Sequence, residues 1–246
     1  MMRQALAIDE QSYGTGHPHI ASDLRYLTSL LYETDRLTEA EPLMRRALAI
    51  DEQSYGVEHP DVATDLSNLA ALLMQTNRPV EAESLMRRAL SINERTYGAD
   101  HPDVANNLNS LTMLLKATNR LTEAEPLMRR ALAIKERSYG PNHPTVAVSL
   151  SNLGELLRLL GQWTDAESLI RHALEIDIAV FGQCHPYTAI DMYKLAMVEH
   201  GKQNTAEASD LLTHALSVLR ASYGDDSHHH IQETLSRMQE IGMDPS

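Results

Sequence analysis

The chain of 246 residues repeats itself every 42 residues, and this period constrains its fold more than any other feature. The segment Leu-Met-Arg-Arg-Ala-Leu occurs at 43–48, 85–90 and 127–132, and looser copies occupy 169–174 and 211–216. A His-Pro pair recurs at the same interval, at His17, His59, His101, His143 and His185. Self-similarity at a fixed period of this size is typical of solenoids, in which each unit packs only against its neighbours. The sequence therefore predicts a row of stacked units in place of conventional domains.

The pattern within one period predicts two antiparallel helices. After His59, the residues Val62, Leu66 and Leu69 recur at helical spacing, and a second apolar stripe starts at Ala82. The proline of each His-Pro pair suits the first helical position, and the glycine after the second stripe suits a helix end. Small residues at matching positions predict close contact between helix backbones. They are Ala70, Gly154 and Ala196 on first helices, and Ala40, Ala47, Ala82, Ala89, Ala124, Ala131, Ala166, Ala173, Ala208 and Ala215 on second helices.

Two side-chain patterns are predicted to stabilise the second helices. Thr-x-x-Glu sets suit capping boxes at their first turns; they are Thr38 with Glu41, Thr122 with Glu125, and Thr164 with Glu167. Glu and Arg four residues apart predict ion pairs along the exposed side; they are Glu41–Arg45, Glu83–Arg87, Glu125–Arg129 and Glu167–Arg171.

The period also predicts the division of the chain. A half repeat at 1–16 comes first, followed by full repeats at 17–56, 57–98, 99–140, 141–182 and 183–224, and by a capping helix with its tail at 225–246. Residue 1 falls inside a repeat, which favours a piece cut from a longer protein over a start in mid-array. Leu6, Ala5 and Ile8 would then lack the preceding helix against which such residues pack, which would leave an exposed apolar patch. We therefore expect self-association through this end.

These motifs resemble the tetratricopeptide repeat. The segments Asn68-Leu69-Ala70 and Asn152-Leu153-Gly154 carry the resemblance, together with the spacing of Ala82, Ala89 and Leu90. The 42-residue length, with Arg-Arg-Ala-Leu-x-Ile in the second helix, is similar to the variant found in kinesin light chains. The resemblance covers about 17–224 of the chain. It implies an all-α fold, a right-handed α-solenoid of antiparallel helix pairs, with partners bound along the concave face lined by the first helices.

The composition narrows the classes of partner. The formal net charge is −13, which argues against non-specific nucleic-acid binding and against an anionic membrane surface. No apolar run approaches the roughly 18 residues that a membrane span needs. The single cysteine, Cys184, excludes an internal disulfide. We therefore expect a cytoplasmic protein.

The residues that could suggest catalysis or metal binding are all interpreted as structural or solvent-exposed. Equivalent histidines of successive repeats are expected to lie at least ~8–10 Å apart, too far to share one ion, so they are interpreted as helix-entry residues packed between units. His228, His229 and His230 are interpreted as a solvated helix start. Trp163 is predicted to be core, and the adjacent Cys184 and His185 are not predicted to be a catalytic pair. No catalytic residue, metal site or cofactor is predicted.

The variable positions of the first helices are the candidate peptide-binding residues. They carry basic side chains in an acidic chain, and methionines, which suit adaptable apolar contacts. The candidates are Arg25, Tyr32, Ser67, Met74, Asn109, Met113, Lys116, Ser151, Glu155, Arg158 and Tyr193. We expect a non-catalytic scaffold that binds a protein or extended peptide, with a preference for acidic segments. The alternative is a regulatory or sensor array cut from a larger NTPase- or protease-linked signalling protein.

Overall fold

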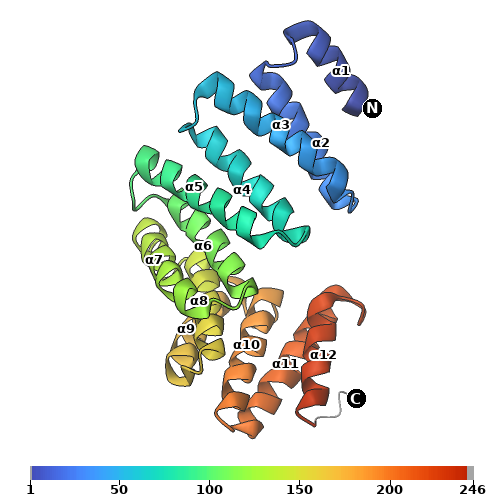
Figure 1. Ribbon diagram of the computed structural model, residues 1–246. Helices are drawn as coiled ribbons and strands as arrows, with labels where there is room; N and C mark the ends of the chain where they lie inside the picture. The colour runs from blue at the N-terminus through green and yellow to red at the C-terminus, as the bar shows by residue number, and fades with distance from the viewer. Residues whose placement is uncertain (1, 243–246) are drawn as a thin grey trace. The chain divides into compact units, whose positions relative to one another are not determined.

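The structure is a computed structural model that describes residues 2–242, without the side chains of Met2, Arg3 and Ala5. This part of the chain contains twelve α-helices and no strand (Figure 1). The helices fall into two compact units, Met1–Arg120 and Leu121–Ser246, so the boundary lies inside the third predicted repeat. Unit 1 contains α1 (Met2–Tyr13), α2 (Pro18–Glu33), α3 (Leu37–Tyr55), α4 (Pro60–Gln75), α5 (Pro79–Tyr97) and α6 (Pro102–Ala117). Unit 2 contains α7 (Leu121–Tyr139), α8 (Pro144–Leu159), α9 (Trp163–Phe181), α10 (Pro186–Gly201), α11 (Thr205–Tyr223) and α12 (His229–Glu240).

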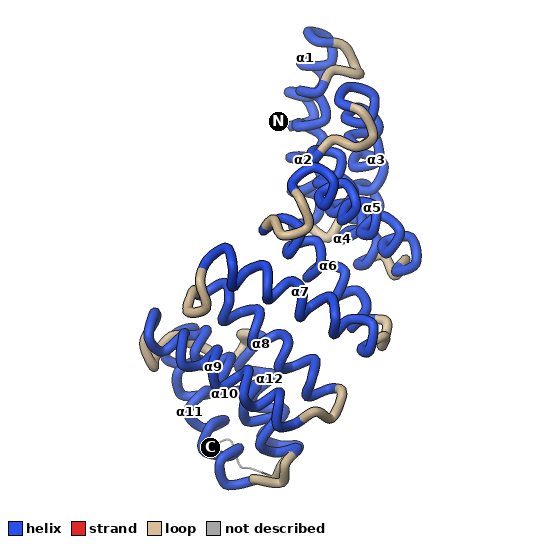
Figure 2. The backbone as a smooth tube through the Cα atoms, turned by 90° about the vertical axis from the view of Figure 1, so that its left-hand side faces the viewer, coloured by secondary structure: helices blue, strands red, loops and turns tan. Residues whose placement is uncertain are grey.

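Within each unit, consecutive helices are joined by short turns and pack against one another (Figure 2). The first helices of the repeats, α2, α4, α6, α8 and α10, have 16 residues each, and the second helices, α3, α5, α7, α9 and α11, have 19. The all-α solenoid of antiparallel helix pairs predicted from the period is therefore confirmed within each unit. None of the helices in the described part of the chain is long and apolar enough to cross a membrane.

Small residues bring the helix backbones together, as predicted. The alanines named above on the second helices are fully buried, and so are Ala70 and Ala196 on the first helices. A Cβ placed on Gly154 would stand 2.5 Å from Cγ1 of Ile170, a distance that no side chain tolerates. Leucines complete the core; in α4, for example, Leu66, Leu69 and Leu73 are fully buried. The small residues that allow close backbone contact and the leucines that fill the core therefore recur at equivalent positions in successive repeats.

The recurrent histidines begin the first helices. His59 Nδ1 accepts a hydrogen bond from the backbone N–H of Asp61 at 3.2 Å, and its ring stacks on Tyr55 with a centroid distance of 4.7 Å. His17, His101, His143, His185 and His228 cap their helices in the same way. The prediction that they are helix-entry residues is confirmed. The prediction that they pack between repeats is also borne out, because each ring stacks on the aromatic residue that ends the second helix of the preceding repeat, although none of these histidines is fully buried.

The predicted capping boxes do not form where the caps are described. Helices α3 and α9 start one residue before Thr38 and Thr164, and their N-cap residues Arg36 and Gln162 have no side-chain cap. The Glu41 carboxylate instead accepts hydrogen bonds from Arg45 and Arg78. All four predicted Glu–Arg pairs do form, at 2.7–3.0 Å.

The helix ends differ in detail from the expected left-handed cap. Gly56 has the positive φ that favours glycine, +88°, but its ψ of 155° is extended. Among the predicted cap glycines, Gly224 adopts the left-handed conformation itself. Trp163 is half-buried rather than fully buried, and its ring lies against Gly201 of the next repeat.

Candidate functional site

A buried ion cluster joins the first two repeats of unit 1. Arg25 on α2 places its guanidinium 2.5 Å from Asp51 Oδ2 on α3 and 3.0 Å from Asp65 Oδ1 on α4. Both aspartates are fully buried, whereas the Arg25 side chain is 27% exposed. Burial raises the pKa of Asp65 to about 7, and the charge of Arg25 opposes that shift.

The same three positions recur 42 residues further on, with different chemistry. Ser67, Asn93 and Asn107 replace the ions; the Asn93 amide donates to Asn107 Oδ1 at 2.6 Å, and the Asn107 amide donates to Ser67 Oγ at 3.2 Å. In unit 2, Lys135 and Ser149 occupy two of these positions, and burial lowers the pKa of Lys135. We call this series of contacts the polar ladder, and each set of three positions a rung.

Two more rungs lie in unit 2. The Ser151 hydroxyl donates to Asp191 Oδ1 at 2.5 Å, and Lys194 Nζ donates to Ser151 Oγ at 2.7 Å. Burial raises the pKa of Asp191 to about 6. In the last rung, the Tyr193 hydroxyl donates to Glu233 Oε1 of α12 at 3.0 Å, and burial raises the pKa of Tyr193 to about 12.

The polar ladder accounts for four of the predicted peptide-binding residues. Arg25, Ser67, Ser151 and Tyr193 occupy the first-helix position of their rungs, and their polar groups bond within the protein. Ser151 is only 2% exposed. Variation at these four positions therefore changes the contacts between neighbouring repeats, while Arg25 and Ser67 also line surface pockets.

The remaining candidates divide between the two units. Glu155 and Arg158 form a bidentate, half-buried ion pair in unit 2, which raises the pKa of Arg158. Tyr32, Met74, Asn109, Met113 and Lys116 lie in unit 1. Met113 is 70% exposed, Lys116 is exposed, and Met74 and Asn109 are half-exposed. No pocket described in unit 1 is lined by these last four residues.

Two adjoining pockets mark the surface of unit 1 formed by α2, α4 and α6, which we call the first-helix face. The first, of about 390 Å³, lies between α2 and α4 and is largely apolar. Tyr32, Ala71, Leu72 and the side of Arg25 contribute to its walls. A shallow depression continues it along α2, past Ser29 to Tyr26, whose side chain is 69% exposed.

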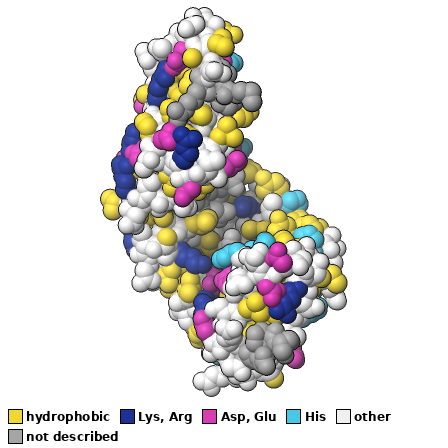
Figure 3. All heavy atoms as spheres, turned by 90° about the vertical axis from the view of Figure 1, so that its right-hand side faces the viewer, with side chains coloured by type: hydrophobic (Ala, Val, Ile, Leu, Met, Phe, Trp, Pro, Cys, Tyr) yellow, Lys and Arg dark blue, Asp and Glu magenta, His cyan; other side chains and the backbone are white. Residues whose placement is uncertain are grey.

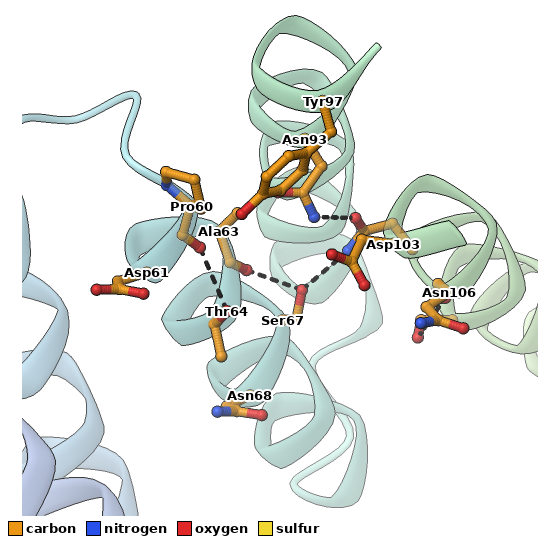
Figure 4. Close-up of a pocket in the computed structure, with 12 residues that line it drawn as sticks. Pro60, Asp61, Ala63, Thr64, Ser67, Asn68, Asn93, Tyr97, Asp103 and Asn106 are labelled. Atoms are coloured by element: carbon orange, nitrogen blue, oxygen red, sulfur yellow. Dashed lines mark hydrogen bonds between the residues drawn. The ribbon is translucent and has the colours of Figure 1, made fainter. Parts of the chain in front are cut away.

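The second pocket, of about 290 Å³, lies between α4 and α6 (Figure 4). Most of its lining residues are uncharged and polar, among them Ser67, Asn68, Asn106 and Ser110. Pro60 and Ala63 add apolar surface, and Asp61 and Asp103 carry its charges. Asn68 lines both pockets. Its exposed side-chain amide has no hydrogen-bond partner in the described part of the chain.

The sequence analysis names Asn68 only as part of a family motif and not as a candidate binding residue. Its position could have indicated a surface residue, because Asn68 lies one residue past the predicted candidate Ser67 and recurs as Asn152 in unit 2. Asn152 accepts a hydrogen bond from Lys194 at 3.3 Å, so the two asparagines have different surroundings.

Charges on the surface are interspersed and paired. Figure 3 shows Lys and Arg side chains beside Asp and Glu side chains on the face that it draws. Many of these pairs connect successive repeats, such as Arg78 with Glu41 at 2.7 Å and Arg120 with Glu83 at 2.5 Å. Exposed pairs of this kind contribute little each to stability, about 0–1 kcal/mol.

Two groups of possible metal ligands occur among the described residues. His229, His230 and Glu233 lie on α12, and Asp9, His19 and Asp23 lie on α1 and α2. Glu233 also accepts the Tyr193 hydrogen bond, and His229 is exposed. Neither group is enclosed, and three ligands of this kind on an open surface do not define a metal site. Cys184 is exposed.

Comparisons with known proteins agree with this architecture. A family model described as "Tetratricopeptide repeat" matches residues 24–95, 61–137, 113–179 and 146–221, which together span most of the chain. No curated protein matches the sequence.

Solved structures of kinesin-light-chain-like proteins share the fold. A putative kinesin light chain of Podosopora anserina with nearly identical TPR-like repeats is 21% identical; the match covers 85% of this chain and 99% of that one, with a TM-score of 0.74. BtubC (BKLC) from P. vanneervenii is 23% identical over 93% of this chain and 89% of its own, with a TM-score of 0.75. YrrB, a TPR protein with an unusual peptide-binding site, is 18% identical over 96% and 98%, with a TM-score of 0.56. With its 42-residue helix pairs and the family model matched over most of its length, the chain belongs to the tetratricopeptide repeat family.

Proposed function

We propose that the first-helix face of unit 1 binds an extended segment of another protein, and that the chain acts as a non-catalytic interaction scaffold. The position of Asn68 carries the proposal. Its unpartnered amide stands where a largely apolar pocket adjoins a polar one. A side-chain amide offers both a donor and an acceptor, which matches the N–H and C=O of an extended peptide backbone. The description of YrrB as a peptide-binding TPR protein supports this use of the fold.

The two pockets suit different parts of such a ligand. Tyr26 and Tyr32 present exposed rings beside the apolar pocket. Tyrosine supplies a large contact area at low conformational cost, so these rings suit an apolar side chain of the ligand. Asn106 and Ser110 in the second pocket suit its backbone or uncharged polar side chains.

The geometry makes an acidic ligand less suitable than the sequence implied. Arg25 already contacts two buried carboxylates, and Arg158 is held by Glu155. Peptide recognition through amides and aromatic rings depends weakly on ionic strength, because few net charges are neutralised. We therefore expect the affinity to change less than threefold between low and moderate salt.

A selection experiment tests the proposal. A library of random 12-residue peptides is selected for binding to the whole chain, and the enriched peptides are measured against single-site variants. Asn68→Ala and Tyr32→Ala are expected to weaken binding about tenfold each, which corresponds to one hydrogen bond or one buried ring face. Because both side chains are exposed, the melting temperatures should stay within about 2 °C of the parent value.

Asn142→Ala is the matched control, since Asn142 lies exposed in the turn before α8. It should leave the affinity unchanged. Enriched peptides that bind the Asn68 and Tyr32 variants as tightly as the parent would place the binding surface elsewhere, and a selection that enriches no peptide would contradict the scaffold function.

A further inference from the structure

The pocket between α2 and α4 lies where both helices carry a small residue at the same repeat position. Ser29 on α2 and Ala71 on α4 lie 42 residues apart, and both line the pocket. The same position carries the longer side chains of Met113, Glu155 and Met197 in the later repeats. Two short side chains at this position leave a cavity of about 390 Å³ between α2 and α4.

The walls of this cavity match a large apolar side chain. Tyr32 and Leu72 supply apolar surface, and the Thr28 hydroxyl in the wall already donates to the Leu24 carbonyl at 2.8 Å. The guanidinium of Arg25 is shared by two buried carboxylates, at 2.5 Å and 3.0 Å, so it has little capacity to bind a carboxylate of a ligand. An aliphatic or aromatic side chain can therefore lose its water here without leaving a polar group of the wall unpaired.

The other charged residues that line the two pockets of the first-helix face are carboxylates. Glu33, at the end of α2, is exposed and has no ion pair in the described part of the chain. Asp61 and Asp103 lie in the first turns of α4 and α6, on either side of the second pocket (Figure 4). Among the described residues, each of these two carboxylates approaches Nδ1 of its capping histidine, at 3.7 Å and 3.5 Å, and no Lys or Arg. A cation on the ligand complements this negative rim.

The spacing of the two pockets sets the register of an extended ligand. Ala71 and Asp61 lie ten residues apart on α4. This corresponds to about 15 Å along the helix axis. An extended segment rises about 3.3 Å per residue, so it covers this distance in about four or five residues. Asn68 lines both pockets and can bond the backbone of the residues in between.

We propose that the partner segment carries a large apolar residue, which enters the pocket between α2 and α4, and a lysine or arginine about four or five residues away, which contacts Asp61 and Asp103. This inference rests on the proposed function, because it uses the same face and the same backbone contact at Asn68. The apolar residue supplies most of the affinity, and the cation selects against acidic segments, because exposed ion pairs are individually weak. The preference is opposite to the acidic one expected from the sequence.

Selection of a random 12-residue peptide library against the whole chain tests the inference. The enriched peptides are expected to share Leu, Ile, Met or Phe, with Lys or Arg at the stated spacing. Replacement of the apolar residue by alanine in an enriched peptide should weaken binding at least tenfold. Replacement of the basic residue by glutamate should weaken it about fivefold. Fluorescence anisotropy of labelled peptides measures both changes.

Two protein variants separate the two features. Ala71→Gln places a longer, polar side chain at the pocket between α2 and α4, and Ala71 is exposed, so the fold should tolerate the change. Selection against this variant should lose the apolar preference and keep the basic one. The double variant Asp61→Asn with Asp103→Asn should keep the apolar preference and lose the basic one.

Matched controls make the same chemical changes in unit 2. Ala179→Gln alters an exposed alanine on α9. The double variant Asp165→Asn with Asp210→Asn removes two exposed carboxylates, one of them in the first turn of α9. Both controls should enrich the same peptides as the parent. Circular dichroism of all variants checks that the helices are retained.

The outcomes distinguish this inference from the proposed function on which it rests. Enriched peptides that require Asn68 but share neither feature would overturn the inference and leave the proposed function intact. An apolar preference that survives Ala71→Gln would place the apolar residue outside the pocket, and enrichment of acidic peptides would remove the role of Asp61 and Asp103. A selection that enriches no peptide would overturn both proposals.

Discussion

The hydroxyl of Ser151 donates a 2.5 Å hydrogen bond to the buried carboxylate of Asp191, which lies on the next first helix of the array. It is one contact of a ladder in which every described rung has different chemistry. The apolar residues around the rungs are nearly the same from repeat to repeat, so they cannot distinguish one interface from another. A polar contact buried among apolar residues costs free energy when it is mismatched. We therefore expect a mismatched pair of neighbouring repeats to be less stable than a matched pair.

The rung at Asp191 makes stability depend on pH in an unusual direction. Because the folded pKa of Asp191, about 6, lies above its ordinary value of 3.8, the folded state binds more protons between these values. The free energy of unfolding therefore falls as pH rises through this window, by at most about 3 kcal/mol from this group. Asp191→Asn removes the ionisation and should become more stabilising, relative to the parent, from pH 4.5 to pH 7.

Urea denaturation of the parent and the variant over that range measures the difference. Other titrating groups contribute equally to both proteins and cancel. Asp210→Asn, at an exposed site on α11, serves as the control and should show a nearly constant difference. A constant difference for Asp191→Asn as well would show that Asp191 is ionised throughout.

Replacement of Arg25 by methionine should destabilise unit 1 by roughly 3 kcal/mol. The change leaves Asp51 and Asp65 buried without their cation, and breaking a buried ion pair on one side costs about 3–5 kcal/mol. The lower part of this range applies because the Arg25 side chain is 27% exposed. Chemical denaturation at pH 8 gives the value, because this pH lies above the pKa of Asp65, which burial raises to about 7.

A transplanted rung provides the matching test. The triple variant Arg25→Ser, Asp51→Asn and Asp65→Asn copies the neighbouring rung of Ser67, Asn93 and Asn107. It should recover most of the lost stability, to within about 1 kcal/mol of the parent. A triple variant as unstable as Arg25→Met would show that the ion cluster is not equivalent to the amide rung.

The sequence predicts the helices and does not predict the polar ladder, for one physical reason. Helix starts, buried alanines and the His-Pro caps recur with the same residue types, so the period reveals them directly. The ladder positions recur with different residue types, and variation on the first helices was interpreted as ligand specificity. Hydrogen bonds such as Ser151–Asp191 join residues 40 positions apart, and only the packing of one repeat on the next brings them together. The sequence does not identify Asn68 as a candidate binding residue, because Asn68 belongs to the repeat motif.

The N-cap of α4 should depend on the acceptor that His59 supplies. Its Nδ1 accepts the Asp61 N–H at 3.2 Å. His59→Asn keeps an acceptor at the cap and loses the stack on Tyr55, so it should be within about 0.5 kcal/mol of the parent.

His59→Ala lacks the acceptor and should be less stable than the parent by about 1 kcal/mol. Thermal unfolding of the parent and of the two variants measures these differences. An alanine variant as stable as the asparagine variant would show that the cap hydrogen bond does not stabilise α4.

The contact between Trp163 and Gly201 should tolerate a change in both residues better than a change in one. A Cβ on Gly201 would stand 2.2 Å from the indole ring, so Gly201→Ala forces the ring or the helix to move. Overpacking of this kind costs about 1–3 kcal/mol.

The equivalent residues one repeat earlier are Leu121 and Leu159, a pair without the tryptophan. Trp163→Leu combined with Gly201→Ala should therefore be more stable than the sum of the two single changes implies, by at least about 1 kcal/mol. Urea denaturation of the parent, both single variants and the double variant completes the cycle. Additive effects would mean that the indole ring moves aside freely and that Gly201 is not required by the tryptophan.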